Sequence, residues 1–236
     1  MTSIHAIINR QLLKWELQQQ QVDRPSAGRT KPPPIITVSR QKGSRGSYFA
    51  SRLAEKMDYQ LLHRDVIDTI CETAGYRKRV VESLDNRFRG ELELLVESVF
   101  TGQMIDHHDY LKHLCRIVLS MSELGGVVLM GRGGNFILGP RRGFHIRYVA
   151  PTERRIANLV TYGHMSESEA TDAVGKADAE RKEFIRKLFG ADIDAPQHYD
   201  LVINADYLDV EELTDAVRAA IEAKFDKLTY MDRERC

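Results

Sequence analysis

Short runs of apolar and β-branched residues recur along the chain, and longer segments with helical periodicity separate them. Strands of a parallel sheet are covered on both faces, so they read as nearly continuous apolar runs. Five runs fit this description: Ile35–Val38, Gln60–Leu62, Val127–Met130, His145–Val149 and Leu201–Ile203. Because helical segments alternate with them, the pattern predicts an α/β fold, with one five-stranded parallel sheet flanked by helices.

The segments between these runs space their apolar residues three or four positions apart, as amphipathic helices do. This spacing predicts helices over residues 48–57, 152–162, 167–188 and 210–225, and a mostly helical stretch over residues 64–124. That stretch is longer than an ordinary connection between strands, so it is predicted to be a helical insertion. In such sheets ligands bind beyond the carboxyl ends of the strands, and the residues after each strand are therefore the candidate site.

Residues 1–34 form a predicted appendage, an amphipathic helix followed by a proline-rich linker at Pro32–Pro34. Gln11 interrupts an apolar stripe that otherwise keeps helical spacing: Ile4, Ile7, Ile8, Leu12 and Trp15. Its polar face is not notably basic, so we expect the stripe to pack on its own domain or on a second copy of the chain, rather than on a membrane surface. A single domain is predicted over residues 35–228, followed by a tail over residues 229–236.

Composition and charge narrow the class of protein. The chain has 236 residues and 42% hydrophobic content, enough for a sizeable core. Lys plus Arg and Asp plus Glu both total 34, so no overall basic field favours nucleic acid as a partner. Its three cysteines are far apart, odd in number and without C-x-x-C spacing, which argues against a disulfide framework or a zinc site. No apolar run is long enough to span a bilayer. We expect a cytoplasmic protein without a membrane partner.

The segment from Ile35 to Tyr48 has the layout of a phosphate-binding loop, because an apolar strand feeds a Gly/Ser/Arg turn and a helix follows directly. Backbone amides of such a turn and the positive end of the helix dipole attract anions. The standard motif is G-x-x-x-x-G-K-[ST]. In that register Arg40 and Arg45 replace the two glycines, Gly46 replaces the lysine, and Ser47 keeps the hydroxyl.

Two further post-strand segments carry anion-binding residues. Gly131–Asn135 follows the third strand, where glycines permit close approach of a ligand and Arg132 offers a planar fork to phosphate. Ala150–Arg155 follows the fourth strand and contains two arginines that also suit a solvated helix face. The charged stretch Lys176–Lys187 leaves the same two interpretations open, because its charges have the i,i+4 spacing of an ordinary exposed helix.

Taken in order, these segments resemble the cytidylate kinase-like proteins, a branch of the P-loop nucleoside monophosphate kinases. The resemblance covers about residues 35–225 and rests on the following sequences: Thr37-Val38-Ser39-Arg40-Gln41 leading into Gly43-Ser44-Arg45-Gly46, Leu61-Leu62-His63-Arg64-Asp65, Gly131-Arg132-Gly133-Gly134-Asn135-Phe136-Ile137-Leu138, Ala150-Pro151 with Arg154-Arg155, Asp178 and Arg181 ahead of Phe189-Gly190, and Tyr199-Asp200-Leu201-Val202-Ile203-Asn204.

The resemblance implies a P-loop kinase that moves the γ-phosphoryl group of ATP, with Mg²⁺, to CMP, dCMP or a related small acceptor. It implies that residues 64–124 receive the monophosphate and that residues 166–190 form a lid. Residues implied near the transferring group are Arg181, Arg45, Lys42 and Arg186. Those implied to bind ATP are Arg40, Gly43, Ser44, Gly46 and Ser47, with Ser47 also a ligand of Mg²⁺. Those implied for the acceptor are Asp65, Arg132, Gly133 and Asp178.

The chain departs from the family pattern at three positions, and these keep an alternative open. Arg45 stands at a usual glycine, Ser47 at a usual basic residue, and His63 at a frequent aspartate, with Asp65 and Asp68 nearby. The alternative is a nucleotide- or phosphate-binding sensor or interaction protein without turnover. The cluster Asp106–Asp109 with His113 also suits a metal site, although a polar start to a helix explains it more simply.

Overall fold

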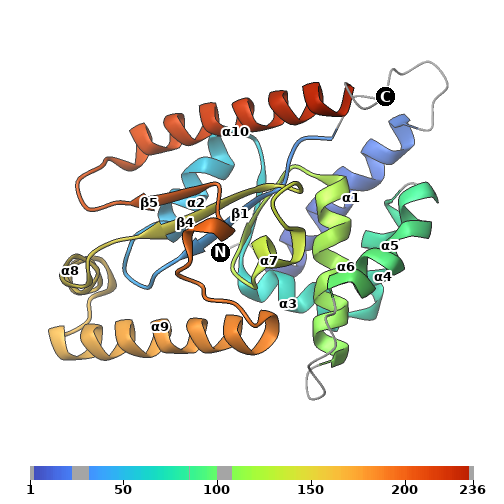
Figure 1. The fold of residues 1–236 in the computed structure, drawn as a ribbon. Coiled ribbons are helices and arrows are strands. Elements are labelled where there is room, and N and C mark those ends of the chain that lie inside the picture. Colours follow the sequence, from blue (N-terminus) through green and yellow to red (C-terminus); the bar gives the residue numbers. More distant parts are fainter. Residues whose placement is uncertain (1–2, 23–31, 85, 100–107, 234–236) are drawn as a thin grey trace. The chain divides into compact units, whose positions relative to one another are not determined.

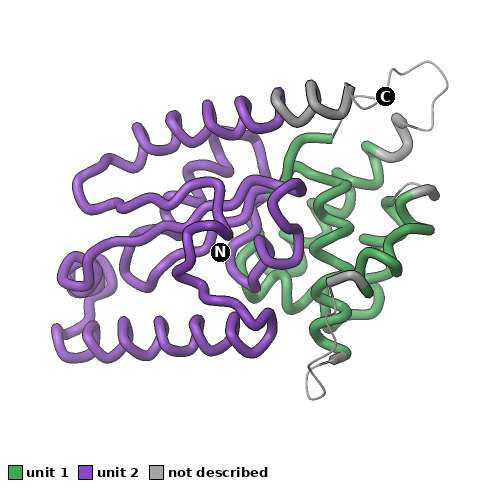
Figure 2. The backbone as a smooth tube through the Cα atoms, in the orientation of Figure 1, with its two compact units in different colours: residues 1–35, 62–127 green, residues 36–61, 128–236 purple. Residues whose placement is uncertain are grey.

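The structure is a computed structural model that describes residues 3–22, 32–84, 86–99 and 108–233. Figure 1 shows the order of the elements along the chain. By its internal contacts the chain divides into two compact units, shown in Figure 2: residues 1–35 with 62–127, and residues 36–61 with 128–236. The first unit therefore combines the amino-terminal segment with the whole of the predicted insertion, and the second holds the predicted phosphate loop and the predicted lid.

The five predicted strands are confirmed and form one parallel sheet. They are β1 Ile36–Arg40, β2 Gln60–Leu62, β3 Val127–Met130, β4 Phe144–Val149 and β5 Leu201–Asn204, in the order β2-β3-β1-β4-β5. The central strand β1 pairs in register with β3 and β4, so that Thr37 stands between Leu129 and His145. This order places the end of β1 between the carboxyl ends of β3 and β4, where the candidate residues follow.

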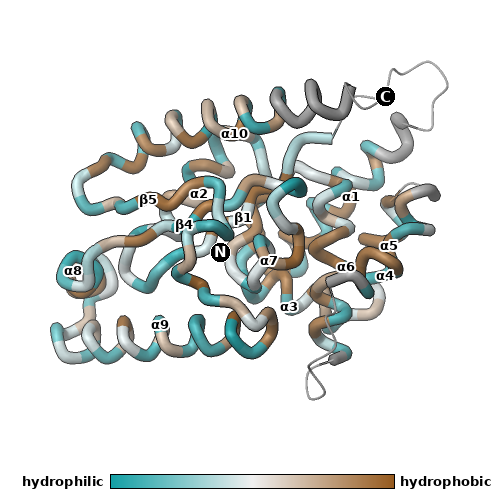
Figure 3. Tube along the Cα trace, viewed as in Figure 1, coloured by the Kyte–Doolittle hydropathy of each residue, from teal (hydrophilic) through white to brown (hydrophobic). Residues whose placement is uncertain are grey.

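The core of the second unit lies between this sheet and two helices, α2 Gly46–Lys56 and α10 Val210–Arg233. Apolar side chains of β1, β3 and β4 meet those of α2 and α10, and in Figure 3 the strands are largely brown. Phe49 of α2 stacks on Tyr148 of β4 with ring centroids 4.8 Å apart. This packing holds the beginning of α2 against the end of the sheet.

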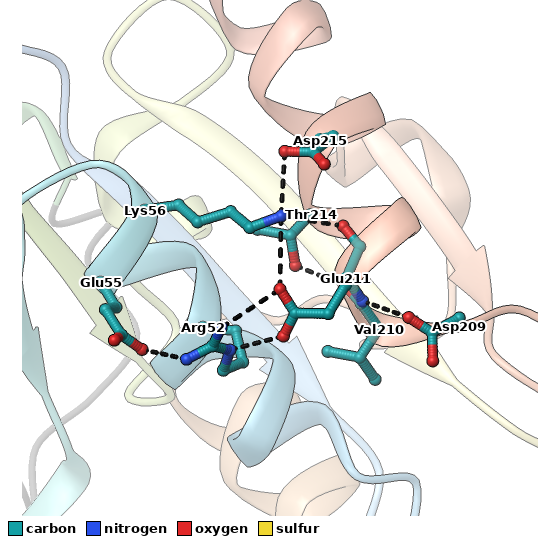
Figure 4. Close-up of polar contacts among 8 residues, drawn as sticks. All are labelled: Arg52, Glu55, Lys56, Asp209, Val210, Glu211, Thr214 and Asp215. Atoms are coloured by element: carbon teal, nitrogen blue, oxygen red, sulfur yellow. Dashed lines mark hydrogen bonds and ion pairs between the residues drawn. The ribbon is translucent and has the colours of Figure 1, made fainter.

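Ion pairs on the outer faces of α2 and α10 complement this packing (Figure 4). The Arg52 guanidinium donates to both carboxylate oxygens of Glu211, at 2.5 and 3.2 Å, and also pairs with Glu55. Lys56 donates to Asp215 at 2.9 Å and to the backbone carbonyl of Glu211 at 3.2 Å. Exposed pairs of this kind contribute little stability, so the apolar packing between α2 and α10 remains the main contact that holds the two helices together.

Helices α8 Thr152–Gly163 and α9 Glu167–Phe189 follow β4, and α9 covers nearly all of the range predicted as a lid, residues 166–190. A capping box starts α9, because the Ser166 side chain accepts from the Glu169 backbone N–H and the Glu169 carboxylate accepts from the Ser166 backbone N–H. Gly190 ends the helix in a left-handed conformation at φ 60°. Figure 3 shows α9 as a largely hydrophilic helix, consistent with burial along a narrow strip only.

The first unit contains α1 Ile4–Val22 and the helices α3 Arg64–Glu72, α4 Ala74–Glu82, α5 Asn86–Val99 and α6 His108–Leu124. Helix α1 contacts α3 and α4. Its predicted apolar stripe is buried at Ile8, Leu12 and Trp15, and the Trp15 indole N–H donates to the Gly125 carbonyl at 3.0 Å. At these three residues the stripe therefore packs within the first unit of its own chain. Of the two predicted alternatives, this is packing on the same chain and not on a second copy.

His145 in β4 carries a buried imidazole and makes folding stability depend on pH. Its Nε2 lies 2.9 Å from the Gly139 carbonyl, which can only accept, so Nδ1 accepts the Thr37 hydroxyl at 2.8 Å in the neutral ring. Burial lowers the pKa of His145 in the folded protein, and the charge of Lys224 acts in the same direction. The folded protein thus holds this side chain neutral.

The unfolded chain binds a proton at this histidine near pH 6.5, whereas the folded chain does so only at lower pH. Stability is therefore full above this pH and falls as the pH drops through it. We expect urea unfolding to show about 1 kcal/mol lost between pH 7.5 and 5.5 through this group. The His145→Gln variant should show a shallower pH dependence, and an unchanged slope would contradict this role.

Candidate phosphate and nucleotide site

The loop between β1 and α2 is closed by its own hydrogen bonds. Gln41 donates its backbone N–H to the Tyr148 carbonyl at 3.1 Å, which continues the pairing of β1 with β4. The buried Ser44 hydroxyl donates to the Gln41 carbonyl at 2.9 Å and accepts the Gly46 N–H at 3.3 Å. These bonds fold residues 41–45 into a turn at the amino terminus of α2, the arrangement that suits an anion.

Helix α8 lies directly against this loop. Gly43 has φ +79°, and a Cβ on it would lie 2.4 Å from the Arg155 carbonyl oxygen. The Asn158 side-chain amide donates to the Gly43 carbonyl at 2.9 Å, and an Arg155 N–H donates to the Lys42 carbonyl at 3.4 Å. The sequence identified Gly43 as a loop glycine, but its close approach to α8 is visible only in the structure.

Arg45 takes an unusual conformation at the boundary between the loop and α2. Its φ of 64° lies in the left-handed region, which glycine adopts far more readily than arginine. Its guanidinium carbon lies 5.0 Å from the ring centres of Tyr48 and of Tyr162 in α8. Cation–π contact with two rings compensates part of the backbone strain and directs the charge toward α8. A role of Arg45 near the transferring group remains a prediction.

A pocket of about 410 Å³ opens beside the loop. Residues of the loop, of α8 and of the segment between β5 and α10 line it: Ser44, Arg45, Tyr148, Arg154, Asn158, Tyr162, Ala205, Asp206, Tyr207, Leu208, Asp209 and Val210. Burial raises the pKa of Tyr148 to about 12, so its hydroxyl stays neutral. Aromatic rings therefore stand beside charged and amide groups in this pocket, the combination found in small-molecule sites.

The segment after β5 was missed by the sequence reasoning. Arg154 donates to the Asp206 backbone carbonyl at 3.2 Å and lies 3.7 Å from its carboxylate, so α8 and the 205–210 segment meet at the pocket. Tyr207 is exposed over 93% of its surface. The rule that ligands bind after the carboxyl ends of strands would have included these residues, but no motif marked them.

Three successive residues after β3 have positive φ: Gly131 at 91°, Arg132 at 57° and Gly133 at 66°. Helix α7 Gly134–Leu138 follows them directly. The Arg132 guanidinium lies 5.2 Å from the ring centre of Phe184 in α9, and a Cβ on Gly133 would lie 2.4 Å from a ring carbon of Phe189. The predicted anion-binding turn is thus packed against the carboxyl-terminal half of α9.

The predicted lid residues have different surroundings. Asp178 accepts from the buried Arg155 at 2.7 Å, and Arg155 also donates to Thr152 at 3.2 Å. Arg186 is exposed and pairs with Glu183, and this hydrogen bond together with one from Lys187 lowers the pKa of Glu183 to about 2. The acceptor role of Asp178 and the catalytic role of Arg186 stay predictions, and so does that of the half-buried Arg181.

A second buried arginine, which the sequence reasoning did not single out, lies near the end of the central strands. Arg147 of β4 donates to the Ser39 hydroxyl at 2.8 Å and to the Asp194 carboxylate at 2.7 Å. It thereby ties the end of β1 to the segment between α9 and β5. Its position within an apolar run had indicated a core strand rather than a functional side chain.

Ser47 and Asp65 are the remaining predicted residues. Ser47 is exposed in the first turn of α2, and a hydroxyl oxygen that leaves room for water suits Mg²⁺. Asp65 belongs to α3 in the first unit, where its exposed carboxylate lies 3.2 Å from Arg64. Both roles remain predictions.

Two further expectations concern metals and membranes. Among the described residues, no group of three or more His, Cys, Asp or Glu could hold a metal ion. Residues 106 and 107 of the predicted His/Asp cluster lie outside the described residues. Within the described part of the chain, every helix is too short or too polar to cross a bilayer.

Comparison with known proteins gives likenesses that include the following three. A uronate isomerase of Corynebacterium glutamicum is 32% identical over 111 residues, which are 47% of this chain and 21% of that protein, so the chain spans about a fifth of this relative. A cytidylate kinase of Ignicoccus hospitalis is 24% identical over 78% of this chain and 96% of its own. An uncharacterized protein from Eubacterium ventriosum superposes with a TM-score of 0.62 at 19% identity, over 80% of this chain and 98% of that one.

Family membership follows from a longer match. The sequence profile of the Cytidylate kinase-like family matches residues 35–207. The match includes the loop between β1 and α2, the turn after β3, helices α8 and α9, and the beginning of the pocket segment after β5. The chain belongs to the cytidylate kinase-like family.

Proposed function

We propose that this protein transfers the γ-phosphoryl group of ATP to a nucleoside monophosphate. The observation that carries the proposal is the closed loop of residues 41–45 at the amino terminus of α2, adjoining a pocket with aromatic and charged walls. A polyphosphate at the loop amides would leave its nucleoside beside Tyr162 and Tyr207. This is the pairing of sites that a nucleoside triphosphate requires.

Phosphoryl transfer needs positioning and charge neutralisation more than covalent help from the protein. The loop amides and the α2 dipole would hold the phosphates, while Arg45 and Arg154 border the nucleoside pocket. Ser47 would help to hold Mg²⁺, which would supply positive charge to offset that of the phosphates. Arg181 and Lys42 are our candidates for additional positive charge around the transferring group.

For the acceptor, we propose CMP or dCMP. The proposal draws on membership of the cytidylate kinase-like family and on the likeness to a cytidylate kinase over nearly its whole length. Arg132 and Gly133 provide a guanidinium and an open turn after β3, which suit the monophosphate. Asp65 remains a candidate contact with the acceptor.

A second candidate is a nucleotide sensor that binds without turnover. Two observations favour it: Gly46 occupies the position of the motif lysine, and the guanidinium of Arg45 is engaged with two tyrosine rings. A protein of this kind would keep the pocket and the loop while lacking charge at the γ-phosphate.

Isothermal titration of ATP with Mg²⁺, then of CMP, separates the two candidates when a coupled assay for ADP follows on the same samples. We expect binding of both ligands and ADP release that depends on CMP or dCMP. ADP release with a different nucleoside monophosphate would keep the kinase and change its acceptor. Binding without release would favour the sensor, and absence of ATP binding would contradict both.

A further inference from the structure

Gly46 and Arg40 compete for the same space at the start of α2. A Cβ on Gly46 would lie 2.6 Å from the Arg40 Cβ, 3.2 Å from the Arg40 Cγ and 3.1 Å from a ring carbon of Tyr148. A separation of 2.6 Å between two Cβ atoms is too short, and rotation of a side chain cannot relieve it because such rotation moves neither Cβ. The motif lysine therefore cannot stand at position 46 while Arg40 keeps its place.

The Arg40 side chain continues from this point toward the end of β3. Its Nη1 lies 3.3 Å from the place where a Cβ on Gly131 would be. Glycine at position 46 makes room for the base of the Arg40 side chain, and glycine at position 131 makes room for its guanidinium. A cation thus lies between the loop that begins α2 and the Gly131–Gly133 turn, at the carboxyl ends of the two central strands.

We infer that Arg40 takes the place of the phosphate-loop lysine and binds the terminal phosphates of ATP from the last position of β1. This inference rests on the proposed function. A guanidinium presents a planar fork that binds phosphate oxygens in pairs, so it supplies at least the charge of the lysine. Of the other two basic loop residues, Arg45 directs its guanidinium to Tyr48 and Tyr162, and Lys42 is the competing candidate.

A double-mutant cycle without nucleotide tests whether a side chain at position 46 and Arg40 compete for the same space. Gly46→Ala adds only the Cβ that meets Arg40, and Arg40→Gly removes the Cβ it meets. We expect Gly46→Ala to lower the melting temperature strongly in the natural chain and much less in the Arg40→Gly background. Equal losses in both backgrounds would overturn the proposed competition. Because no ligand is present, this result does not depend on kinase activity.

Titration of Mg·ATP and of inorganic tripolyphosphate tests the phosphate role. Arg40→Ala should weaken both ligands by about tenfold or more, as expected for loss of a charged hydrogen bond. Arg40→Lys should retain part of the affinity, and the paired change Arg40→Gly with Gly46→Lys, which restores the motif lysine, should recover most of it. Arg218→Ala, an exposed arginine of α10, is the matched control and should bind as the natural chain does.

The outcomes separate this inference from the proposed function. Natural protein that binds neither ligand would overturn both. Natural protein that binds both, together with an Arg40→Ala variant of equal affinity, would overturn only the role of Arg40. If Lys42→Ala lost more affinity for the two ligands than Arg40→Ala did, this would also overturn the role of Arg40 and would assign the charge to Lys42.

Discussion

Replacing Gly43 by alanine should destabilise the second unit by about 2–4 kcal/mol and abolish measurable binding of Mg·ATP. Gly43 has φ +79°, and the added Cβ would lie 2.4 Å from the Arg155 carbonyl oxygen and 2.9 Å from its carbonyl carbon. These are backbone atoms of α8, so no side chain can rotate to relieve the contact. The loop would have to move away and would lose the hydrogen bond from Asn158.

Thermal and urea unfolding of the variant measure the first effect, and titration with Mg·ATP measures the second. The matched control is Gly175→Ala in α9, because a Cβ there meets nothing within 4 Å and the residue is helical. Alanine at position 175 should stabilise the protein by up to about 1 kcal/mol. If the two variants proved equally stable, the contact between the loop and α8 would not exist as described.

The central strands of the sheet were predictable from the sequence because they are buried on both faces: all of β3 and all but the last residue of β4 are buried. The apolar run Val127–Met130 and the shorter segment Gln60–Leu62 gave β3 and β2 with the same boundaries, and β4 begins one residue earlier than predicted, at Phe144. The helical insertion was predicted for a different reason, the three- and four-residue spacing of its apolar residues, and the parallel fold was predicted because helical segments alternate with the strands. The local sequence is enough to identify a strand when successive residues all face the core, because they then form a continuous apolar run.

The candidate site was predictable only in part, because its remaining members meet across long sequence separations. The loop glycines and Arg132 stand in recognisable turns. Tyr162 and Tyr207 come from α8 and from the segment after β5, and nothing in either local sequence indicates a shared pocket. The contact between Arg40 and position 46 likewise depends on how the loop closes, since six residues of sequence allow many geometries.

The charged stretch of α9 illustrates what the structure adds. From the sequence, every charge in Lys176–Lys187 had the spacing of an exposed helix face. In the structure, Arg186 pairs with Glu183 one turn away on the surface, whereas Asp178 reaches a buried arginine of α8. Two residues with the same pattern therefore differ in role, and only the distant partner separates them.

Asp178→Ala should lower the free energy of unfolding by about 2–3 kcal/mol, because it leaves the Arg155 guanidinium buried without its carboxylate. Arg155 is 4% exposed and lies 2.7 Å from Asp178, whose side chain is 33% exposed. Water can therefore replace part of the lost interaction, so the expected decrease in the free energy of unfolding is smaller than for a fully buried pair. Because Arg155 also donates to the Lys42 carbonyl, the change should loosen α8 from the phosphate loop and weaken Mg·ATP binding.

Asp172→Ala is the matched control, since Asp172 is exposed on the same helix, and it should change stability by less than about 0.5 kcal/mol. Urea unfolding of both variants gives the comparison, and titration with CMP distinguishes the two roles of Asp178. A carboxylate that only binds the acceptor would leave stability unchanged and weaken CMP alone. A carboxylate that ties α9 to α8 would lower stability and ATP affinity together, and the double variant Arg155→Met with Asp178→Leu would recover stability because no buried charge remains.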